Sequence, residues 1–151
     1  GIIGCEPFIN GVAMLLGKMR DAGVENIRIH PGDVRDLFDV LPEASVAKAF
    51  LLYPDPWPKK KHHKRRIVQL PFVELVRSRL EPGGKLHMAT DWQAYAEFMA
   101  EVIAEAPGFV NTAPAETAPF VERPDFRPLT KFEQRGERLG HGVWDLIYRR
   151  V

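Results

Sequence analysis

The sequence predicts an α/β fold, a three-layer sandwich whose central sheet is mostly parallel. Short apolar runs alternate with segments that carry apolar residues at helical spacing, and prolines or glycines separate most of them. The apolar run at 46–53 is typical of a strand buried on both faces. Strands that alternate with helices pair in parallel, because each helix returns the chain to the edge at which the previous strand began.

Local patterns predict the elements in order. Residues 1–5 form a short buried strand, and apolar residues recur at helical spacing over 10–22. A second strand at 27–30 is closed by Pro31 and Gly32. The remaining elements are a short helix at 37–41, the strand at 46–53, a helix at 71–80 ended by 81–84, a strand at 85–89, a helix capped by Thr90 or Asp91 and running to 105, a strand at 109–112, a loop with four prolines at 113–128 and a strand at 143–149.

Composition limits the classes of protein. With 151 residues, 45% of them hydrophobic and 27% charged, the chain has the size and content of one globular domain, which we expect to span 1–151. Cys5 is the only cysteine, which excludes an internal disulfide, and its surroundings lack the spacing of a metal site. The sequence shows no membrane-spanning stretch and no signal peptide, so we expect a cytoplasmic protein in a reducing compartment.

Positive charge is concentrated in one segment. The net charge is only +1, yet six of the 21 Lys and Arg residues lie within 59–66, which indicates a contact surface. These cations can hold a sugar-phosphate backbone, while Asp55 and Trp57, directly before them, can bind the edge and the face of a nucleobase. The alternatives are a solvated loop for the charged run and a rigid, proline-flanked turn around Trp57.

Four acidic residues, Glu6, Asp33, Asp55 and Asp91, each follow a predicted strand. In open α/β sheets ligands bind at the carboxyl ends of the strands. Glu6 is placed to accept both hydroxyls of a ribose and Asp33 to accept an adenine amino group, which indicates a cofactor that contains adenosine. The alternative for each residue is an ordinary helix cap. A glycine-rich cofactor loop is absent from the sequence.

Three motifs in the second half are more specific. They are Tyr-Pro-Asp-Pro-Trp-Pro-Lys-Lys-Lys-His-His-Lys-Arg-Arg-Ile at 53–67, His-Met-Ala-Thr-Asp-Trp at 87–92, and Thr-Lys-Phe-Glu at 130–133 followed by Arg-Gly-Glu-Arg-Leu-Gly-His-Gly-Val-Trp-Asp-Leu at 135–146. Together they closely resemble the bacterial tRNA (guanine-N7-)-methyltransferase family. The resemblance implies a Rossmann-like class I methyltransferase that uses S-adenosyl-L-methionine to methylate N7 of a guanine in the variable loop of tRNA.

The same resemblance implies roles for single residues. Asp55 is the expected catalytic residue, and Glu6, Asp33 and Asp55 are the expected cofactor-binding residues. The expected substrate-binding residues are Lys59, Asp91, Thr130, Lys131, Phe132 and Glu133, and the expected RNA-binding residues are Lys61, His62, His63, Lys64, Arg65 and Arg66. The expected partner is tRNA, with no metal and no membrane, and the expected state is a monomer or weak homodimer.

One feature of the family has no counterpart in this sequence. Its first strand and glycine-rich cofactor loop are missing, and in the class I order that strand lies between the strands predicted at 1–5 and 46–53. We therefore expect an N-terminally incomplete domain with two unpaired strand edges.

Guanine chemistry narrows the roles of the carboxylates. N7 already carries an in-plane lone pair, so its attack on a methyl sulfonium requires positioning more than a strong base. A carboxylate on the far edge of the base accepts hydrogen bonds from N1–H and N2–H and stabilises the positive charge that develops on the ring. Asp55 and Glu133 are the candidates for this role, with Asp91 third.

Other classes of protein fit parts of the pattern. A methyltransferase of exocyclic amino groups uses a similar acidic, proline-rich and aromatic loop, and a non-catalytic RNA-binding module needs the basic run without the acidic residues. A nuclease needs a Glu-x-Lys or Asp-x-Lys triplet near Asp55, and no such triplet occurs in the sequence.

Overall fold

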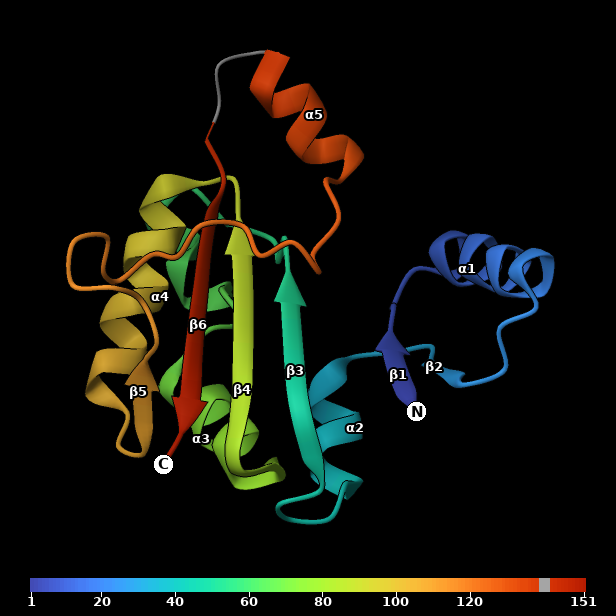
Figure 1. The fold of residues 1–151 in the computed structure, drawn as a ribbon, viewed down its shortest axis with the longest axis horizontal. Helices are drawn as coiled ribbons and strands as arrows, with labels where there is room; N and C mark the ends of the chain where they lie inside the picture. The colour runs from blue at the N-terminus through green and yellow to red at the C-terminus, as the bar shows by residue number, and fades with distance from the viewer. Residues whose placement is uncertain (139–141) are drawn as a thin grey trace. The chain divides into compact units, whose positions relative to one another are not determined.

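The computed structural model describes residues 1–138 and 142–151, apart from the side chains at 132, 136 and 137. The chain forms two compact units, Gly1–Leu41 and Pro42–Val151, and each is described by itself (Figure 1). Their elements alternate between strand and helix over most of the chain, which confirms the predicted α/β class.

The first unit contains two strands and two helices. Strand β1 (Ile2–Cys5) pairs in parallel with β2 (Ile27–His30), and helix α1 (Ile9–Ala22) connects them. Helix α2 (Val34–Val40) follows and begins three residues earlier than predicted, because the side chain of Asp33 caps it. The register pairs Cys5 with His30, so β1 and β2 end at the same edge, and Glu6 and Asp33 follow directly after it.

The second unit contains a four-stranded sheet in the order β3-β4-β6-β5. Strands β3 (Val46–Leu52) and β4 (Leu80–Thr90) are parallel, whereas β6 (Trp144–Arg150) runs antiparallel to both β4 and β5 (Phe109–Asn111). Two of the four strand pairs in the chain are therefore antiparallel, and the sheet is mixed where the sequence predicted a mostly parallel one. The cause is the final strand, which enters between β4 and β5 in the reverse direction.

Helices α3 (Leu70–Arg79) and α4 (Gln93–Glu105) cover one face of this sheet (Figure 1). They bury Val73, Val76, Tyr95 and Met99 against strand residues such as Met88, and this interface forms the core. The opposite face carries the predicted proline-rich loop, which bonds to the sheet through a bridge between Val121 and Asp145. Two of the predicted layers, sheet and helices, are thus present within the second unit.

Strand β4 begins at Leu80, five residues before the predicted start. Leu80 pairs with Val46, and the register then shifts before Lys48 pairs with Lys85. Gly83 provides the positive φ of 82° that this irregularity needs, and at Gly84 a Cβ atom would lie 2.8 Å from the carbonyl oxygen of Glu81. The glycines that were expected to end α3 instead form a bulge at the beginning of the strand.

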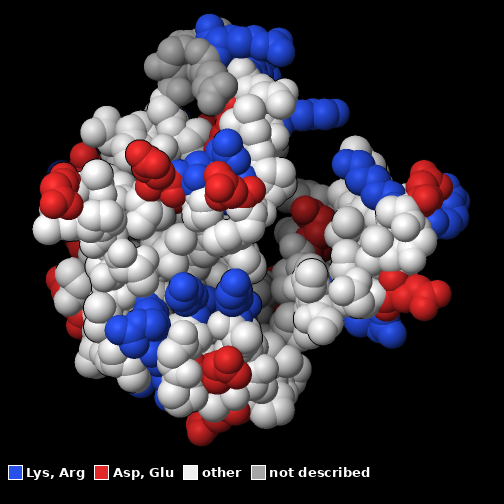
Figure 2. All heavy atoms as spheres, viewed as in Figure 1, with Lys and Arg blue, Asp and Glu red and all other residues white. Residues whose placement is uncertain are grey.

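The sheet face opposite α3 and α4 is basic. Figure 2 shows Lys and Arg side chains gathered over its middle, where the register places Lys48, Lys85 and Arg149 side by side on three neighbouring strands. These residues are far apart in the sequence, so no local pattern indicated this second group of cations.

Candidate active site

Three segments meet at one edge of the sheet in the second unit. Ala89, near the end of β4, pairs with Leu52 on one side and with Asp145 on the other. The turn that contains Asp55 follows Leu52, and Asp91 follows the end of β4. The structure therefore brings the Asp55 turn and Asp91 to the edge at which β6 begins.

The Asp55 turn is strained on both sides of the carboxylate. Tyr53 and Trp57 have φ values of 53° and 41°, a region that bulky side chains rarely adopt and that costs on the order of 1 to 3 kcal/mol for each residue. Asp55 itself is exposed, and its Oδ1 accepts a 3.2 Å hydrogen bond from the backbone N–H of Trp57. Backbone strain of this kind clusters at functional sites, and here it presents one carboxylate to solvent.

Trp57 packs within its own turn. The guanidinium carbon of Arg65 lies 5.1 Å from the centre of the indole ring, and the imidazole of His62 meets the ring edge-on at 5.8 Å. Of the two interpretations of Trp57, these contacts favour the rigid turn, since Arg65 already covers part of the ring.

The basic segment continues from this turn as a short 3-10 helix, Lys60–Arg65. His62 and His63 are half-buried, and a ring nitrogen of His63 lies 3.3 Å from the carbonyl oxygen of Pro58. Five cationic side chains are exposed and together are called the cationic strip: Lys59, Lys60, Lys61, Lys64 and Arg65.

Arg66 does not belong to the strip, which corrects the expectation that it contacts RNA. Its side chain is only 3% exposed and lies over the rings of Tyr95 and Phe98, at 4.9 and 4.8 Å from their centres. Its Nε donates a 2.8 Å hydrogen bond to the carbonyl oxygen of Pro56. Arg66 therefore fixes the Asp55 turn to α4 from inside and is not available to a phosphate group.

Asp91 is exposed and does not cap α4. The residue at the N-cap is Trp92, whose backbone N–H donates to Oγ1 of Thr90, so neither predicted cap forms with the helix as expected. Without a capping role in the described structure, the Asp91 side chain lies open to solvent beside the Asp55 turn.

Glu133 lies in a buried ionic cluster, in contrast to Asp55. Its two carboxylate oxygens accept hydrogen bonds of 2.6 and 2.7 Å from Arg127, whose guanidinium also donates two bonds of 2.7 Å to Asp145. Asp145 in turn lies 2.6 Å from Nε2 of His87. All four residues are at most 3% exposed, and they are called the ionic cluster: His87, Arg127, Glu133 and Asp145.

The cluster also begins helix α5 (Lys131–Arg138). Thr130 is its N-cap: Oγ1 of Thr130 accepts a 3.2 Å bond from the N–H of Glu133, and the Glu133 carboxylate accepts a 2.9 Å bond from the N–H of Thr130. This reciprocal pair is a capping box, and the Thr-x-x-Glu spacing is its sequence signal. That signal could have indicated a structural role for Glu133, whereas no pattern marked Arg127.

Electrostatics within the cluster keep both acids ionised. Burial raises the pKa of Glu133, but the hydrogen bonds from Arg127 and Thr130 outweigh burial and hold the pKa at about 2. Burial likewise opposes ionisation of Asp145, and the bonds from His87 and Arg127 nevertheless hold its pKa below the usual range. Burial raises the pKa of Tyr53, whose hydroxyl interacts with Thr130 and Glu133, so the Asp55 turn and the cap of α5 are in contact.

The remaining site residues differ in exposure. Lys131 is exposed and Thr130 is half-buried, while the side chain of Phe132 lies outside the described residues. Across the described ranges, His, Cys, Asp and Glu side chains form no group of three that could hold a metal ion. In the same ranges no helix is long and apolar enough to cross a membrane.

The two acids of the first unit follow neighbouring parallel strands. Oε1 of Glu6 accepts a 3.0 Å hydrogen bond from the N–H of Phe8, and Gly11 of α1 leaves room for this side chain, since a Cβ there would lie 2.9 Å from Cγ of Glu6. Asp33 caps α2 through a 2.8 Å bond from the N–H of Arg35 and forms an ion pair with the Arg35 side chain. Hydrogen bonding with Arg35 is the main reason that the pKa of Asp33 is lowered.

Solved methyltransferase structures share this fold. A methyltransferase homologue from Pyrococcus horikoshii superposes with a TM-score of 0.69 at 15% identity, covering 99% of this chain and 53% of that one. A Streptococcus mutans protein solved in complex with SAH superposes with a TM-score of 0.63 at 8% identity, covering 99% of this chain and 75% of that one. The fold is that of the class I S-adenosylmethionine-dependent methyltransferases.

Sequence comparison identifies the family. Residues 1–146 match the model of a family described as "Putative methyltransferase", and the chain belongs to this family. A relative from Chromohalobacter salexigens, named tRNA (guanine-N(7)-)-methyltransferase, is 63% identical over 150 residues. The alignment covers 99% of this chain and 61% of the relative, so the chain spans about three fifths of that protein's length. These matches confirm the resemblance that the three motifs indicated.

Proposed function

We propose that this protein transfers a methyl group from S-adenosylmethionine to N7 of a guanine in the variable loop of tRNA. The observation that carries the proposal is the Asp55 turn: a strained backbone exposes one carboxylate at the end of β3, and the cationic strip follows it directly. A relative with 63% identity is named for the same reaction, which supports the choice of guanine N7 and of tRNA.

The acids of the first unit suit the nucleoside part of the cofactor. Glu6 uses Oε1 for the N–H of Phe8, and its carboxylate retains acceptor capacity for ribose hydroxyls at the end of a parallel strand. Asp33 is partly exposed, and its oxygens are shared with Arg35, so an adenine amino group would use their remaining lone pairs. We propose that Glu6, Asp33 and Asp55 hold the cofactor, which supplies the methyl group on a sulfonium sulfur when bound.

The chain's own contribution to the reaction is positioning. Guanine N7 needs no deprotonation before it attacks, so the residues of the site must hold the base in line with the methyl carbon. We propose that Asp55 accepts hydrogen bonds from N1–H and N2–H, a pair worth about 1 to 3 kcal/mol of discrimination against other bases. The same carboxylate stabilises the positive charge that develops on the ring as N7 is methylated.

Asp55 is a better candidate for this contact than Glu133. Glu133 is 2% exposed and both of its oxygens are bonded to Arg127 and Thr130, so contact with the base would require the ionic cluster to open. Among the described residues the Asp55 carboxylate accepts one hydrogen bond, from the N–H of Trp57, and Asp91, also exposed, is the second choice. We propose that Lys59, Asp91, Thr130 and Lys131 line the tRNA site and that Lys61, His62, His63, Lys64 and Arg65 contact its backbone.

The test is to incubate the full-length protein with an unmodified tRNA transcript and labelled S-adenosylmethionine, and then to digest the RNA to nucleosides. Label in 7-methylguanosine is the expected result. Label in an N2- or N6-methylated nucleoside would assign the protein to the exocyclic-amino methyltransferases, and no label in any nucleoside would reject the proposal.

A variant separates an enzyme from an RNA-binding module. Asp55→Ala should lower methyl transfer by about 100- to 1000-fold, the effect of removing one preorganised electrostatic group, while tRNA affinity stays within about threefold. Glu101→Ala removes an exposed carboxylate from α4 and serves as the matched control, with unchanged transfer. Unchanged transfer in Asp55→Ala would remove this residue from the active site.

A further inference from the structure

We propose that Arg127 is a positioning residue of the methyl-transfer reaction. It ties the first turn of α5 to the sheet and thereby fixes Thr130 and Lys131, which the proposed function assigns to the tRNA site. The inference deepens the proposed function and rests on it, because it assigns a reason for the burial of Glu133 within a motif that otherwise faces the substrate.

The hydrogen bonds of Glu133 indicate that the ionic cluster holds the first turn of α5. Glu133 accepts two bonds from Arg127 and two from Thr130, through the backbone N–H at 2.9 Å and Oγ1 at 3.1 Å. With these bonds and only 2% exposure, the carboxylate is closed off from a ligand by its own protein partners. Its orientation instead determines where Thr130 lies.

Arg127 connects this cap to the strands. Its Nε and Nη2 bond to the two oxygens of Asp145, which sits opposite Ala89 in the pairing of β6 with β4. The planar guanidinium thus holds one carboxylate on the sheet and another on α5 at the same time, a geometry that the single ammonium of a lysine cannot reproduce. The backbone carbonyl of Arg127 also accepts a 2.6 Å bond from the Arg123 side chain.

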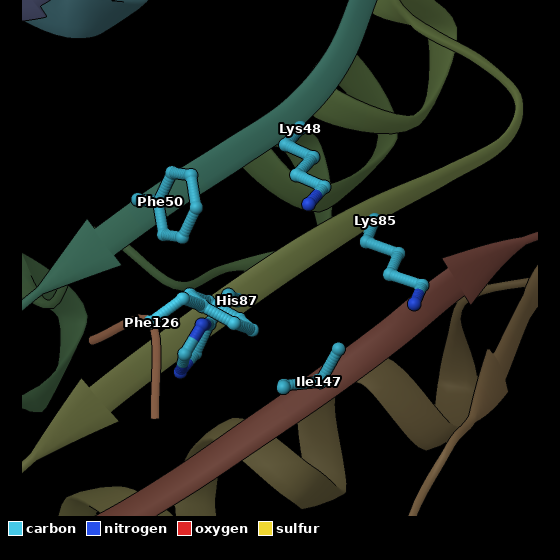
Figure 3. Close-up of a pocket in the computed structure, with 6 residues that line it drawn as sticks. All are labelled: Lys48, Phe50, Lys85, His87, Phe126 and Ile147. Carbon is cyan, nitrogen blue, oxygen red and sulfur yellow. The ribbon is translucent and has the colours of Figure 1, made fainter. Parts of the chain in front are cut away.

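The residue before Arg127 anchors the same segment on the open sheet face. Figure 3 shows Phe126 over His87, in the pocket that Lys48, Phe50, Lys85 and Ile147 complete. The Phe126 ring meets His87 and Phe50 edge-on, at centre distances of 5.9 and 6.4 Å. His87 also lies within hydrogen-bond distance of Asp145, so the Phe126 contact and the Arg127–Asp145 bonds both lead to His87 on β4.

Helix α5 depends on this attachment. The helix projects away from the sheet (Figure 1), and its described hydrogen bonds to the rest of the unit lie at its first turn, around Thr130 and Glu133. Thr130 and Lys131 lie at this attached end of the helix, next to Glu133 and its bonds to Arg127. Small changes at Arg127 should therefore displace Thr130 and Lys131 relative to the Asp55 turn, and misplacement by about 1 Å can cost on the order of 100-fold in rate.

The experiment compares four variants of the full-length protein by steady-state methyl transfer to an unmodified tRNA transcript: Arg127→Lys, Thr130→Ala, the double variant, and Arg77→Lys as a matched control. Arg77 forms an ion pair with Glu74 on α3, away from the site. Transfer is measured below the unfolding midpoint of each variant, so that loss of folded protein does not contribute.

A positioning role predicts a specific pattern. Arg127→Lys should lower kcat by about 10- to 100-fold, and adding it to Thr130→Ala should lower kcat by no more than about twofold further, because both changes remove one function. Arg77→Lys should leave kcat unchanged. Two results would overturn the inference: kcat of Arg127→Lys within twofold of the wild type, or losses that multiply in the double variant.

Asp145→Asn keeps the inference testable if Arg127→Lys does not fold. The amide has the shape of the carboxylate but cannot accept both guanidinium bonds, so the same fall in kcat is expected and an unchanged kcat overturns the inference. Failure here is distinguishable from failure of the proposed function. If the proposed function is wrong, the wild type forms no 7-methylguanosine. If only the inference about Arg127 is wrong, the wild type and the variants are all active.

Discussion

Carboxylate side chains have opposite environments in the Asp55 turn and in the ionic cluster. Asp55 is exposed, accepts a hydrogen bond from the N–H of Trp57 and sits between two strained residues, whereas Glu133 and Asp145 are buried and bonded to Arg127. Both regions lie at one edge of the sheet, and both fall within motifs that resemble one family. If the proposed function holds, a carboxylate in a family motif acts either on a ligand, as we propose for Asp55, or on the structure that holds the site, as Glu133 does, and burial and partners distinguish the two.

The largest expected difference between the two regions is in stability. Arg127→Met leaves two buried carboxylates without their shared cation, so the free energy of unfolding should fall by about 3 to 5 kcal/mol. Lys59→Met removes an exposed cation from the strip and should change that free energy by at most about 0.5 kcal/mol. Urea unfolding followed by circular dichroism measures the free energy of unfolding of both variants. Equal losses would show that the ionic cluster and the cationic strip do not differ in their contribution to stability.

Acid should unfold the protein through the cluster. The pKa of Glu133 is about 2 in the folded state, below its ordinary value of 4.5, so its stabilisation is complete above about pH 4.5 and is lost as the pH falls toward 2. Asp145 is shifted in the same direction. Glu133→Gln should flatten this part of the stability curve, while Glu74→Gln, which removes a more exposed partner of Arg77, should not. Parallel curves for Glu133→Gln and the wild type between pH 4.5 and 2 would contradict the assignment.

Gly11 in α1 provides a test of whether Glu6 binds the cofactor. A methyl group at Gly11 would lie 2.9 Å from Cγ of Glu6, so Gly11→Ala must displace that carboxylate, and affinity for S-adenosylhomocysteine should fall by about 3- to 10-fold, the equivalent of one hydrogen bond. Gly17→Ala lies on the same helix with nothing within 4 Å of the new Cβ and should leave affinity unchanged. Calorimetric titration of the full-length protein distinguishes them, and identical affinities would argue against Glu6 as a ligand.

The smallest expected effects concern salt. If all five side chains of the cationic strip meet phosphates, the slope of log K against log salt for tRNA binding should be about −3.5, at roughly −0.7 per contact. Lys64→Gln should reduce the magnitude of the slope by about 0.7, so the ratio of wild-type to variant affinity should fall by about threefold between ~50 and ~200 mM salt. Arg66→Gln should destabilise the fold and leave the slope unchanged, since Arg66 is buried. Equal slopes for Lys64→Gln and the wild type would remove Lys64 from the interface.

Sequence patterns predicted most elements because local periodicity and proline or glycine punctuation specify them. β2 matches its prediction in full, and β3 and α1 differ from theirs by one residue. The direction of β6 could not be predicted from local sequence patterns, because it depends on where the last segment of the chain enters the sheet. The early start of β4 could not be predicted for a similar reason. Pro82 and the two glycines after it resemble a helix end, and they form a bulge only when paired with β3.

The site was predicted in part. Family motifs indicated the Asp55 turn and the Thr130–Glu133 segment, but they did not separate exposed from buried members. Arg66 stands beside five exposed cations in the sequence, and only packing against Tyr95 and Phe98 turns it inward. Arg127 lies in a proline-rich loop without periodicity, so its partners on β6 and α5 emerge only when distant segments meet.

The most direct test of the contrast between the two regions is methyl transfer by Asp55→Ala, measured together with its unfolding midpoint. We expect 7-methylguanosine formation to fall by about 100- to 1000-fold while the midpoint stays within about 2 °C of the wild type, because an exposed carboxylate contributes to the reaction and little to the fold. A folded Asp55→Ala protein that forms 7-methylguanosine at the wild-type rate would contradict it.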